Sequence, residues 1–452
     1  MWRVDDIVEA VKGIPLVVEK ETFSGVSTDS RTIEKGQLFV PLTGRNFDGH
    51  AFVKEAYKRS RAGFLCQKDR RDVLSGAEGT IILVDDTMEA LFDLAHYKRK
   101  QLQSTVIAIT GSNGKTTTKE ILANIMKRGF SVHYNEKNYN NVIGVSQSIL
   151  AIEKDPDFCI FELGTNNPGE IAELARLTEP DVSLITNINP SHLEGLSDLE
   201  GVVEEKLSLF YGTRENGKVV INADDPHIGR RFKSNGHVRT TYAIVNPADL
   251  TLTVEQDLDW EGSIILFRRA GDEFRARTNL LGMHNLYNIL AAAAAASAVG
   301  VDFKLITEGI EDFQSYGMRF KPAPSKKGYV VIDDTYNANP SSMEWAIKTL
   351  LQLPCKGKRI VILGDMKELG EKTAFYHQEL GELLDKSGIE VIALFGEHMR
   401  DAFRQLQDGR ARFFENKKEL IEYAVGETKE GDVVLVKGSR ASRMEDVVEA
   451  LK

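Results

Sequence analysis

Short apolar runs alternate with helical stretches along most of this chain, and this alternation restricts the fold more than any other feature. In the middle of the sequence the runs lie at 158–164, 182–188 and 218–225, and each is followed by a stretch with helical periodicity. Apolar runs of this length that are joined through helices are typical of buried parallel strands. The sequence therefore predicts an α/β fold, in which helices cover parallel sheets.

The same pattern divides the chain into three expected domains. At 452 residues the chain is too long for one core and long enough for about two to four domains. A polar helical stretch at 90–103 closes the first block, and alternating, hairpin-like runs after Arg239 predict an antiparallel insert in the second. Strand-like runs separated by helices return from 328 onward and predict a doubly wound, Rossmann-like unit. We expect domains at 1–100, 101–314 and 315–452.

Composition and charge disfavour several classes of function. The 57 basic and 67 acidic residues give a net charge of −10, which argues against nucleic acid as the main partner. Cys66, Cys159 and Cys355 lack metal-type spacing, so a reducing compartment is expected. The N-terminus lacks the apolar run of a signal peptide, and the alanine-rich segment 289–301 is too short to cross a bilayer. We expect a cytoplasmic monomer that does not bind a membrane, with 289–301 as a closely packed core helix.

The segment VIAITGSNGKTTTKEIL at 106–122 joins an apolar run to a helix through a turn with two glycines. It departs from the common phosphate-binding spelling, because Ile109 stands where the first glycine is usual. The physical parts are nevertheless present. Backbone N–H groups at the helix start favour phosphate, Lys115 can neutralise phosphate oxygens, and the Thr116 hydroxyl can reach a Mg²⁺ ion. The alternative, a glycine turn before an ordinary helix, is disfavoured because strand, turn, lysine and threonine all fall in register.

Further motifs follow this segment in a defined order. They are NYNNVIG (138–144), ELGTNNPGEI (162–171), ITNINPSHLE (185–194), LLGMHNLYN (280–288), DDTYNANPSSM (333–343), LGDMKELG (363–370) and VKGSRASRME (436–445). With TGSNGKTTTKE they resemble the Mur ligase family, the ATP-dependent ligases that build the cytoplasmic peptidoglycan precursor. The resemblance covers nearly the whole chain and implies three domains: one that binds a UDP-sugar, a central ATP-binding domain, and a C-terminal domain that binds the incoming amine and closes on ATP.

Glu162 and His192 each follow an apolar run that is expected to be a buried strand. They would therefore lie at the carboxyl edge of a parallel sheet, where α/β proteins place ligands. A carboxylate and an imidazole near a phosphate-binding loop suit a divalent ion that bridges phosphates. A lone histidine is more often structural, but the resemblance assigns both residues to Mg²⁺, together with Thr116.

Lys206 lies on an apolar helix face, in register with Val203, Leu207 and Phe210. A lysine there must extend its amine to solvent, form an ion pair or lose its charge, because burial lowers its pKa. The residue pattern by itself favours extension to solvent. In the family the matching lysine is carbamylated by CO₂, and the new carboxylate helps to hold a second Mg²⁺; the resemblance implies the same here. Many relatives carry Gly-Glu after this lysine, where Leu207 and Ser208 stand in this chain.

The resemblance also implies roles for residues that spacing alone leaves open. The expected catalytic residues are Lys115, Lys206, His192 and Arg319. The expected ATP-binding residues are Thr110, Gly111, Ser112, Asn113, Gly114, Lys115, Thr116, Thr117, His284, Asn288, Asp334 and Tyr336. The expected substrate-binding residues are Ser30, Arg31, Asp48, Gly49, His50, Asn138, Asn140, Asn141, Asn337, Asn339, Lys437, Ser439 and Arg440. For several of these, a surface charge or a turn-capping asparagine is an equally good interpretation of the residue type.

The expected reaction is amide-bond formation driven by ATP. The carboxylate of UDP-N-acetylmuramoyl-tripeptide attacks the γ-phosphate, and the amine of D-alanyl-D-alanine then displaces phosphate from the acyl phosphate. Lys115 and two Mg²⁺ ions stabilise the charge being transferred. The spelling YNANP at 336–340 resembles that of the family branch that adds D-alanyl-D-alanine, and this resemblance favours the dipeptide over a free diamino acid. The alternatives are a sister ligase that adds a diamino acid, a folylpolyglutamate-type ligase, which lacks the first module, and a nucleotide-regulated binding protein.

Overall fold

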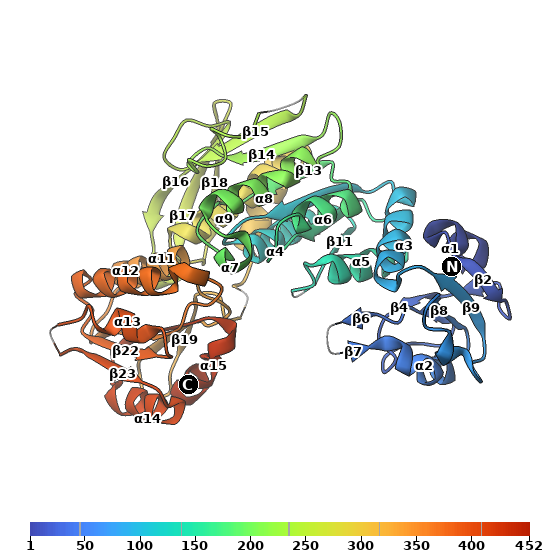
Figure 1. The fold of residues 1–452 in the computed structure, drawn as a ribbon. Helices are drawn as coiled ribbons and strands as arrows, with labels where there is room; N and C mark the ends of the chain where they lie inside the picture. Colours follow the sequence, from blue (N-terminus) through green and yellow to red (C-terminus); the bar gives the residue numbers. More distant parts are fainter. Residues whose placement is uncertain (45–46, 137, 234–235, 316, 408) are drawn as a thin grey trace. The chain divides into compact units, whose positions relative to one another are not determined.

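The computed structural model describes residues 1–44, 47–136, 138–233, 236–315, 317–407 and 409–452. Strands and helices alternate throughout, so the predicted α/β class is confirmed, and Figure 1 shows the course of the chain. Contacts divide the chain into two units. The first comprises Met1–Ala108, Phe130–Gly164 and Glu170–Asp181, and the second Ile109–Gly129, Thr165–Gly169 and Val182–Lys452.

The first unit holds a five-stranded sheet in the order β2 (Ile14–Val17), β9 (Thr80–Val84), β8 (Gly63–Gln67), β5 (Gln37–Phe39) and β4 (Gly25–Ser27). Its strands run parallel, except that the edge strand β2 pairs antiparallel with β9. Both β8 and β9 are buried almost throughout, which explains their unbroken apolar sequences. The helices of this part are α1 (Val4–Val11), α2 (Val53–Ser60) and α3 (Thr87–Gln101).

Shorter elements complete the first unit. The strands β1 (Trp2–Arg3) and β3 (Thr22–Phe23) form one antiparallel pair, and β6 (Thr43–Gly44) and β7 (Phe47–Asp48) form another. The parallel pair β11 (Val132–Tyr134) and β12 (Phe158–Glu162) is joined through α5 (Val142–Leu150), and α6 (Glu170–Thr178) follows. Asn141 fixes the start of α5, because its side chain accepts a hydrogen bond from the N–H of Gly144 at 2.9 Å.

In the second unit, six strands lie side by side in chain order. They are β13 (Val182–Ile185), β14 (Lys218–Asn222), β15 (Val238–Ala243), β16 (Leu250–Asp257), β17 (Ser263–Arg269) and β18 (Asp272–Thr278). The pairs from β13 to β16 are parallel, whereas β16, β17 and β18 are antiparallel to one another. The predicted antiparallel insert is therefore present and consists of β16, β17 and β18. The exposed start of β15 interrupts its apolar pattern and concealed a parallel strand.

Helices α4 (Lys115–Met126), α7 (Leu193–Leu196), α8 (Leu199–Tyr211), α9 (Met283–Ala298) and α10 (Phe303–Glu311) belong to the same unit. The alanine run forms α9, and every residue from Ile289 to Ala298 is buried, which confirms the predicted core helix. Small side chains let α9 pack closely against α4. Within the residues that the structure describes, no helix has the length and apolarity needed to cross a bilayer.

The chain ends in a six-stranded sheet in the order β19 (Lys321–Pro324), β20 (Val330–Asp334), β24 (Val433–Lys437), β21 (Arg359–Gly364), β22 (Val391–Phe395) and β23 (Ala411–Phe414). All its strands are parallel except the edge strand β19. The connecting helices are α11 (Pro340–Gln352), α12 (Thr373–Lys386), α13 (Met399–Phe403) and α14 (Lys417–Glu427), and α15 (Glu445–Leu451) closes the chain.

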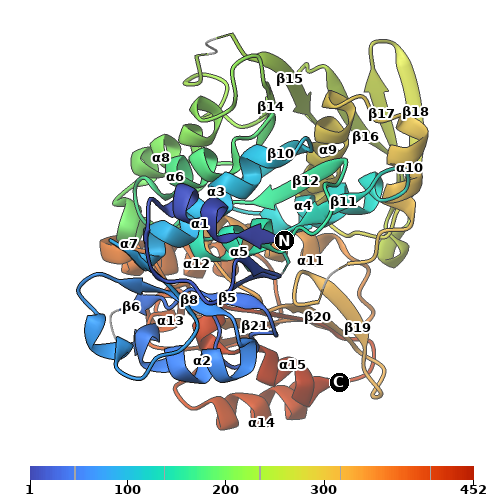
Figure 2. The same ribbon diagram turned by 90° about the vertical axis from the view of Figure 1, so that its right-hand side faces the viewer.

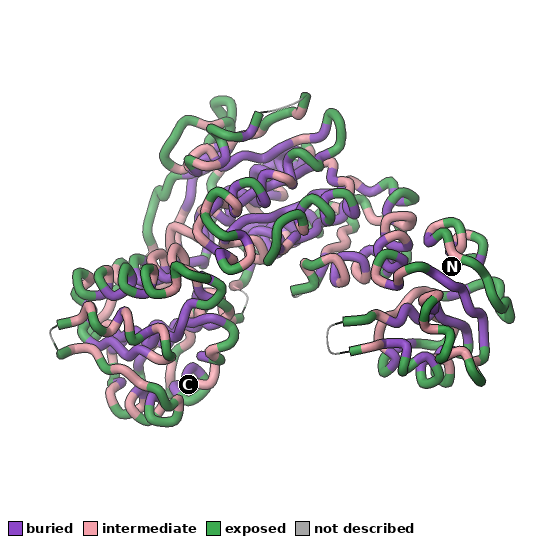
Figure 3. Tube along the Cα trace, in the orientation of Figure 1, coloured by how far each residue is buried: buried purple, intermediate pink, exposed green. Residues whose placement is uncertain are grey.

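Alternate residues of these strands face opposite sides, so both faces of the sheet are covered. Ile332 and Leu435 pack in the layer of α11, α12 and α13, whereas Val331 and Val436 pack in the layer of α14 and α15. Figures 1 and 2 show α11 and α12 on one side of the sheet and α14 and α15 on the other. Figure 3 shows the buried strands between helices whose outer surfaces are exposed. The doubly wound arrangement predicted from the sequence is confirmed.

Candidate active site

The segment 110–117 forms a tight loop between β10 (Thr105–Thr110) and α4. Gly111 has φ 150° and Gly114 has φ 81°, which only glycine adopts readily. A Cβ atom on Gly111 would lie 1.9 Å from Oγ1 of Thr186, and one on Gly114 would lie 2.0 Å from Oδ1 of Asn288. Both glycines are therefore required by geometry. Ile109 is fully buried, so the loop starts after it, without the first glycine of the common spelling.

Residues 186–191 support this loop from behind. The Ser112 hydroxyl donates to the carbonyl of Asn189 at 2.7 Å, and the N–H of Asn113 donates to Oδ1 of Asn187 at 3.0 Å. The Thr186 hydroxyl in turn donates to the carbonyl of Asn113 at 2.6 Å. The loop is thus held before any ligand arrives. From ITNINPSHLE only His192 was predicted to be a site residue. The many polar residues of this motif could have indicated that it supports the loop.

The first turn of α4 brings the predicted phosphate-binding groups together. The amine of Lys115 lies over the loop and donates to the carbonyl of Gly111 at 2.7 Å. The Thr116 hydroxyl accepts a hydrogen bond from Nη2 of Arg319 at 3.0 Å. Thr117 follows on the same turn and is partly buried, and the carbonyl of Thr110 accepts from the N–H of Thr186 at 2.9 Å.

Arg319 also connects the loop with the strand end that carries Asp334. Its guanidinium carbon lies 4.0 Å from the ring centroid of Tyr336, a cation–π distance. One oxygen of Asp334 accepts the N–H of Phe320 at 3.1 Å, and the other lies 2.7 Å from the amine of Lys437. These contacts bring together four predicted site residues. Arg319 was predicted to be catalytic, Asp334 and Tyr336 to bind ATP, and Lys437 to bind the substrate.

The two predicted asparagines of the YNANP loop differ in environment. Asn339 caps α11, because its side chain accepts the N–H of Ser342 at 2.9 Å, and its amide also donates to Oδ1 of Asn113 at 2.8 Å. Asn337 is exposed, and its carbonyl accepts from the amine of Lys437 at 2.9 Å. The turn-capping interpretation thus describes Asn339, while the exposed side chain of Asn337 is accessible to a substrate.

His284 and Asn288 lie in the first turns of α9, and Asn288 contacts the loop. Burial lowers the pKa of His284 to about 4; the carboxylate of Asp334 opposes this effect, whereas the charge of Lys437 adds to it. The imidazole is therefore neutral at physiological pH. The amide of Asn288 stands beside Gly114 and donates to Oδ1 of Asn285 at 3.2 Å, which makes it part of the wall that supports the loop.

Lys206, in α8, does not extend to solvent as its residue pattern favoured. Only 1% of its surface is exposed. Burial lowers the pKa of Lys206 well below its ordinary value, and the charge of Lys115 lowers it further, while Glu205 has the opposite effect. The oxygens of Glu205 accept the hydroxyl of Thr165 at 3.0 Å and the N–H of Gly169 at 2.6 Å, so they are engaged with other groups. Burial therefore disfavours the protonated form of the Lys206 amine.

His192 precedes α7 and faces Glu368, a residue that the sequence analysis quoted within LGDMKELG without assigning it a role. Nδ1 of His192 lies 2.7 Å from Oε2 of Glu368. The ring N–H is not aligned for a regular hydrogen bond, but the separation is that of a close contact between an imidazole and a carboxylate. The hydrogen bond with His192 lowers the pKa of the Glu368 carboxyl despite the opposing effect of burial, and the charges of His192 and Lys115 act in the same direction.

Comparison with known proteins places this geometry in a family. Three family descriptions match the chain: "Mur ligase family, catalytic domain" over residues 22–99, "Mur ligase middle domain" over 109–296, and "Mur ligase, glutamate ligase domain" over 318–440. The UDP-N-acetylmuramoyl-tripeptide–D-alanyl-D-alanine ligase of Bacillus subtilis is 34% identical, over 99% of this chain and 98% of its own length. The chain belongs to the Mur ligase family.

Solved structures of Mur ligases share the fold as well. A MurF crystal structure from Acinetobacter baumannii superimposes with a TM-score of 0.92 at 28% identity, covering 100% of this chain and 98% of that one. The MurF ligase of Thermotoga maritima, solved with ADP, has a TM-score of 0.84 at 29% identity and covers 94% and 96% of the two chains. This Mur ligase therefore has the three-domain α/β fold that the sequence predicted.

Glu162 ends β12 in the first unit of this Mur ligase and is buried. Its Oε1 accepts a hydrogen bond from the amide of Asn140 at 2.9 Å, and its backbone is held by Asn135. Of the other predicted asparagines nearby, Asn141 caps α5 and Asn138 is exposed. The carboxylate of Glu162 is thus fixed in orientation at the end of its strand.

Most of the substrate residues predicted in the first domain are tied into internal contacts. Arg31 is exposed and grips Asp29 through Nε at 2.9 Å and Nη2 at 2.8 Å, which lowers the pKa of Asp29 to about 2. The ring of His50 is fully buried; its Nε2 accepts the N–H of Gln67 at 3.2 Å, so Nδ1 carries the proton that is shared with Asp48 at 2.9 Å. A Cβ atom on Gly49 would meet the backbone of Leu42 at 2.7 Å, and Ser30 is buried.

The last two predicted residues follow β24. Ser439 is buried, with its N–H bonded to the carbonyl of Asp365 at 3.0 Å, whereas Arg440 is exposed and pairs with Glu445 at 2.9 Å. Among the residues that the structure describes, no three His, Cys, Asp or Glu side chains are grouped to hold a metal by themselves.

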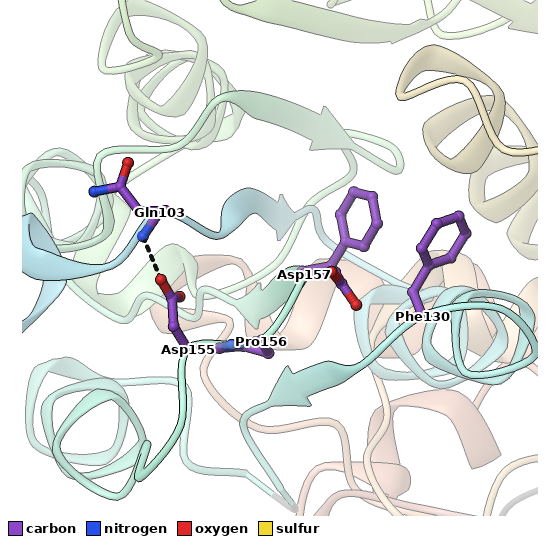
Figure 4. Close-up of a pocket in the computed structure, with 6 residues that line it drawn as sticks. Gln103, Phe130, Asp155, Pro156 and Asp157 are labelled. Atoms are coloured by element: carbon purple, nitrogen blue, oxygen red, sulfur yellow. Dashed lines mark hydrogen bonds between the residues drawn. The ribbon is translucent and has the colours of Figure 1, made fainter.

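A separate recess of about 440 Å³ lies in the first unit, between Gln103, Phe130 and residues 155–158. Figure 4 shows Asp155 accepting the backbone N–H of Gln103, at 2.8 Å. Asp157 is bonded by Ser131, whose N–H lies at 2.8 Å and whose hydroxyl lies at 2.6 Å. These carboxylates connect neighbouring segments of the chain, and the predicted site residues are not among those that line the recess.

Proposed function

We propose that this Mur ligase joins D-alanyl-D-alanine to UDP-N-acetylmuramoyl-tripeptide, with ATP as the energy source, and releases UDP-N-acetylmuramoyl-pentapeptide, ADP and phosphate in peptidoglycan precursor synthesis. The observation that carries the proposal is the match, over 99% of this chain, with the Bacillus subtilis ligase of that specificity. The loop at 110–117, whose glycines leave no room for a Cβ atom, supports the use of ATP. The ADP in the Thermotoga maritima structure supports it as well.

The chain's own residues account for the charge that moves in the reaction. The tripeptide carboxylate attacks the γ-phosphate and forms an acyl phosphate, and the amine of D-alanyl-D-alanine then displaces phosphate. Backbone N–H groups at the start of α4 and the amine of Lys115 are proposed to stabilise phosphate oxygens, and their position at the loop supports this role. Arg319 reaches the same turn and adds a second cation. Asp334 and Tyr336, which Arg319 and Lys437 hold in place, are proposed to contact the nucleotide.

Mg²⁺ fits the donor atoms that the chain offers. The Thr116 hydroxyl and the buried Glu162 carboxylate are oxygen donors of the kind that Mg²⁺ prefers, and we assign the ion to these residues with His192. When bound, Mg²⁺ neutralises charge on the phosphates and polarises them. We further propose that Lys206 is carbamylated and contributes to a second ion. Its amine is buried where the protonated form is disfavoured, and the free amine would attack CO₂ and form a carbamate with release of one proton.

The remaining assignments complete the proposal. Residues 1–100 are proposed to bind the UDP-sugar, 101–314 to bind ATP and 315–452 to bind the incoming amine, boundaries that the matched family segments support. We propose Ser30, Arg31, Asp48, Gly49, His50, Asn138, Asn140, Asn141, Asn337, Asn339, Lys437, Ser439 and Arg440 as the substrate-binding set. We also propose that the enzyme acts as a monomer in the cytoplasm, where ATP is available.

A substrate panel scored by ADP release tests this function. ADP should appear only when UDP-N-acetylmuramoyl-tripeptide and D-alanyl-D-alanine are both present, and little should appear with lysine, diaminopimelate or D-glutamate as the amine. Tripeptides that end in lysine and in diaminopimelate should be supplied in parallel. Efficient addition of a diamino acid to the dipeptide precursor, without reaction with D-alanyl-D-alanine, would assign the chain to the sister specificity. Nucleotide binding without any ligation would favour a regulated binding protein.

A further inference from the structure

Two residues with unusual backbone conformations face each other beside the nucleotide loop. His192 has φ 54° and Glu368 has φ 65°, a left-handed region that residues other than glycine seldom occupy. Such conformations cost free energy and persist only where their surroundings enforce them, most often at functional sites. Here the two residues are joined through Nδ1 of the imidazole and Oε2 of the carboxylate, 2.7 Å apart.

The segment around Glu368 is held against the segment around Glu194 by contacts that do not involve the Glu368 side chain. The N–H of Glu194 donates to the carbonyl of Glu368 at 3.2 Å. A Cβ atom on Gly370 would lie 3.2 Å from Cα of Glu194, so the two segments approach closely. Leu369 is 1% exposed and belongs to the same apolar core as Leu193. Because these contacts do not involve the carboxylate, removing it should leave the two segments in place.

The carboxylate therefore has little structural importance of its own. The Glu368 side chain is 49% exposed, and ion pairs this accessible to water contribute little to stability. The contact with Glu368 instead fixes the orientation of the His192 imidazole. With Nδ1 engaged, Nε2 is the remaining ring nitrogen, and it makes no hydrogen bond within the residues that the structure describes. The neighbouring Ser191 hydroxyl donates to the Ser112 hydroxyl of the loop at 3.0 Å, which ties the histidine segment to the nucleotide loop.

We propose that Glu368 is a positioning residue for His192: its carboxylate accepts the Nδ1 proton, fixes the ring tautomer and presents Nε2 to the divalent ion that accompanies ATP. Imidazoles that bind metals usually donate their other N–H to a carboxylate or carbonyl group, which holds the ring and raises its basicity. The inference rests on the metal role proposed above for His192. If Glu368 has this role, the position of residues 366–370, which follow β21, directly affects the ATP site.

Three variants test the proposal. Glu368→Ala removes the acceptor, whereas Glu368→Gln keeps an oxygen that can accept the Nδ1 proton. Glu371→Ala is the matched control, because Glu371 is an exposed carboxylate of the same loop and has no ion pair within the described residues. The tautomer of His192 is read by ¹⁵N–¹H NMR of ¹⁵N-histidine protein at about pH 8.5, roughly two units above the usual imidazole pKa. A His192→Gln spectrum identifies its signal among the nine histidines. Metal affinity is read from Mn²⁺ binding in the presence of ADP and from the Mg²⁺ dependence of ADP release.

In Glu368→Ala we expect the Nδ1–H tautomer to lose its dominance and the half-saturating concentrations of Mn²⁺ and Mg²⁺ to rise by about tenfold or more. Turnover at saturating Mg²⁺ should change far less. Glu368→Gln should keep the Nδ1–H tautomer, and the Glu371→Ala control should match the parent protein in both tautomer and metal affinity. Unchanged tautomer or unchanged metal affinity in Glu368→Ala would overturn the proposal, as would an equal loss in Glu371→Ala. If the parent protein failed to ligate D-alanyl-D-alanine, the NMR and Mn²⁺ measurements would still decide the role of Glu368.

Discussion

Replacing Lys206 with methionine tests whether the buried amine is neutral in the folded chain. Methionine keeps the length of the side chain but cannot take up a proton. In the folded protein burial lowers the pKa of Lys206 well below its ordinary value, whereas in the unfolded chain it returns to roughly 10.4. Between these two values the unfolded chain binds one proton more than the folded chain. The free energy of unfolding must therefore rise with pH across this window.

The size of the effect follows from proton linkage. One proton of difference gives about 1.4 kcal/mol per pH unit, so within this window the free energy of unfolding of the parent protein should rise with that slope relative to Lys206→Met. The destabilisation by Lys206 is largest at the low end of the window and vanishes as the pH approaches roughly 10.4. At the lower pH the methionine variant should therefore be the more stable protein.

Urea unfolding at several pH values measures the difference. Trp260 and Trp345 lie in the same unit as Lys206, so their fluorescence reports its unfolding, and Trp2→Phe removes the signal of the other unit. The buffers must be free of CO₂, because a carbamate would stabilise the folded form. Lys304→Met is the matched control, since Lys304 is an exposed lysine on α10 of the same unit. Parallel pH dependences for the parent and Lys206→Met would show that Lys206 is protonated when folded, and would refute the argument.

Other substitutions test the nucleotide loop and the carbamate. Lys115→Ala should keep the fold by circular dichroism but lower kcat by about 10²- to 10³-fold, because it removes a cation that faces the transferred phosphate; near-normal turnover would end that assignment. Lys206→Ala should be nearly inactive and regain part of its ADP release with a short carboxylic acid in the buffer, whereas full activity at low Mg²⁺ would exclude a metal-binding carbamate. Gly114→Ala should lower stability by about 2 kcal/mol or more and weaken ADP binding, because the residue has φ 81° and its Cβ atom would lie 2.0 Å from Asn288. The control Gly169→Ala has a similar φ of 89° but open space at Cβ, so equal losses in both variants would leave only backbone strain as the cause.

Local structure was predictable because its causes are local in the sequence. The loop at 110–117 follows from two glycines between an apolar run and a helix. The core helix α9 follows from its alanines, and the terminal sheet follows from apolar runs separated by helices. The parallel strand β15 was missed because it is exposed at one end, and a strand covered only in part loses the apolar pattern of its parallel neighbours.

Lys206 marks the limit of pattern-based inference. Periodicity placed it on the buried face of α8, but a lysine on such a face usually extends its amine to the nearest solvent. Whether solvent is within reach depends on what covers the helix, and segments remote in sequence supply that cover. The structure buries the amine near Lys115, which only the folded arrangement could show.

The contacts that assemble the site join residues that no sequence window contains. Thr116 meets Arg319, Asn113 meets Asn339, and His192 meets Glu368; in each pair the first residue lies near the ATP loop and the second lies in the last third of the chain. The sequence pointed to all of these residues except Glu368, but it did not say which side chains would touch. These pairs have a shared consequence. A change in the position of residues 318–370 alters the hydroxyl of Thr116, the amide of Asn113 and the imidazole of His192 together. Occupancy of the amine site is therefore expected to affect ATP chemistry through geometry, without any direct contact between the amine and the loop.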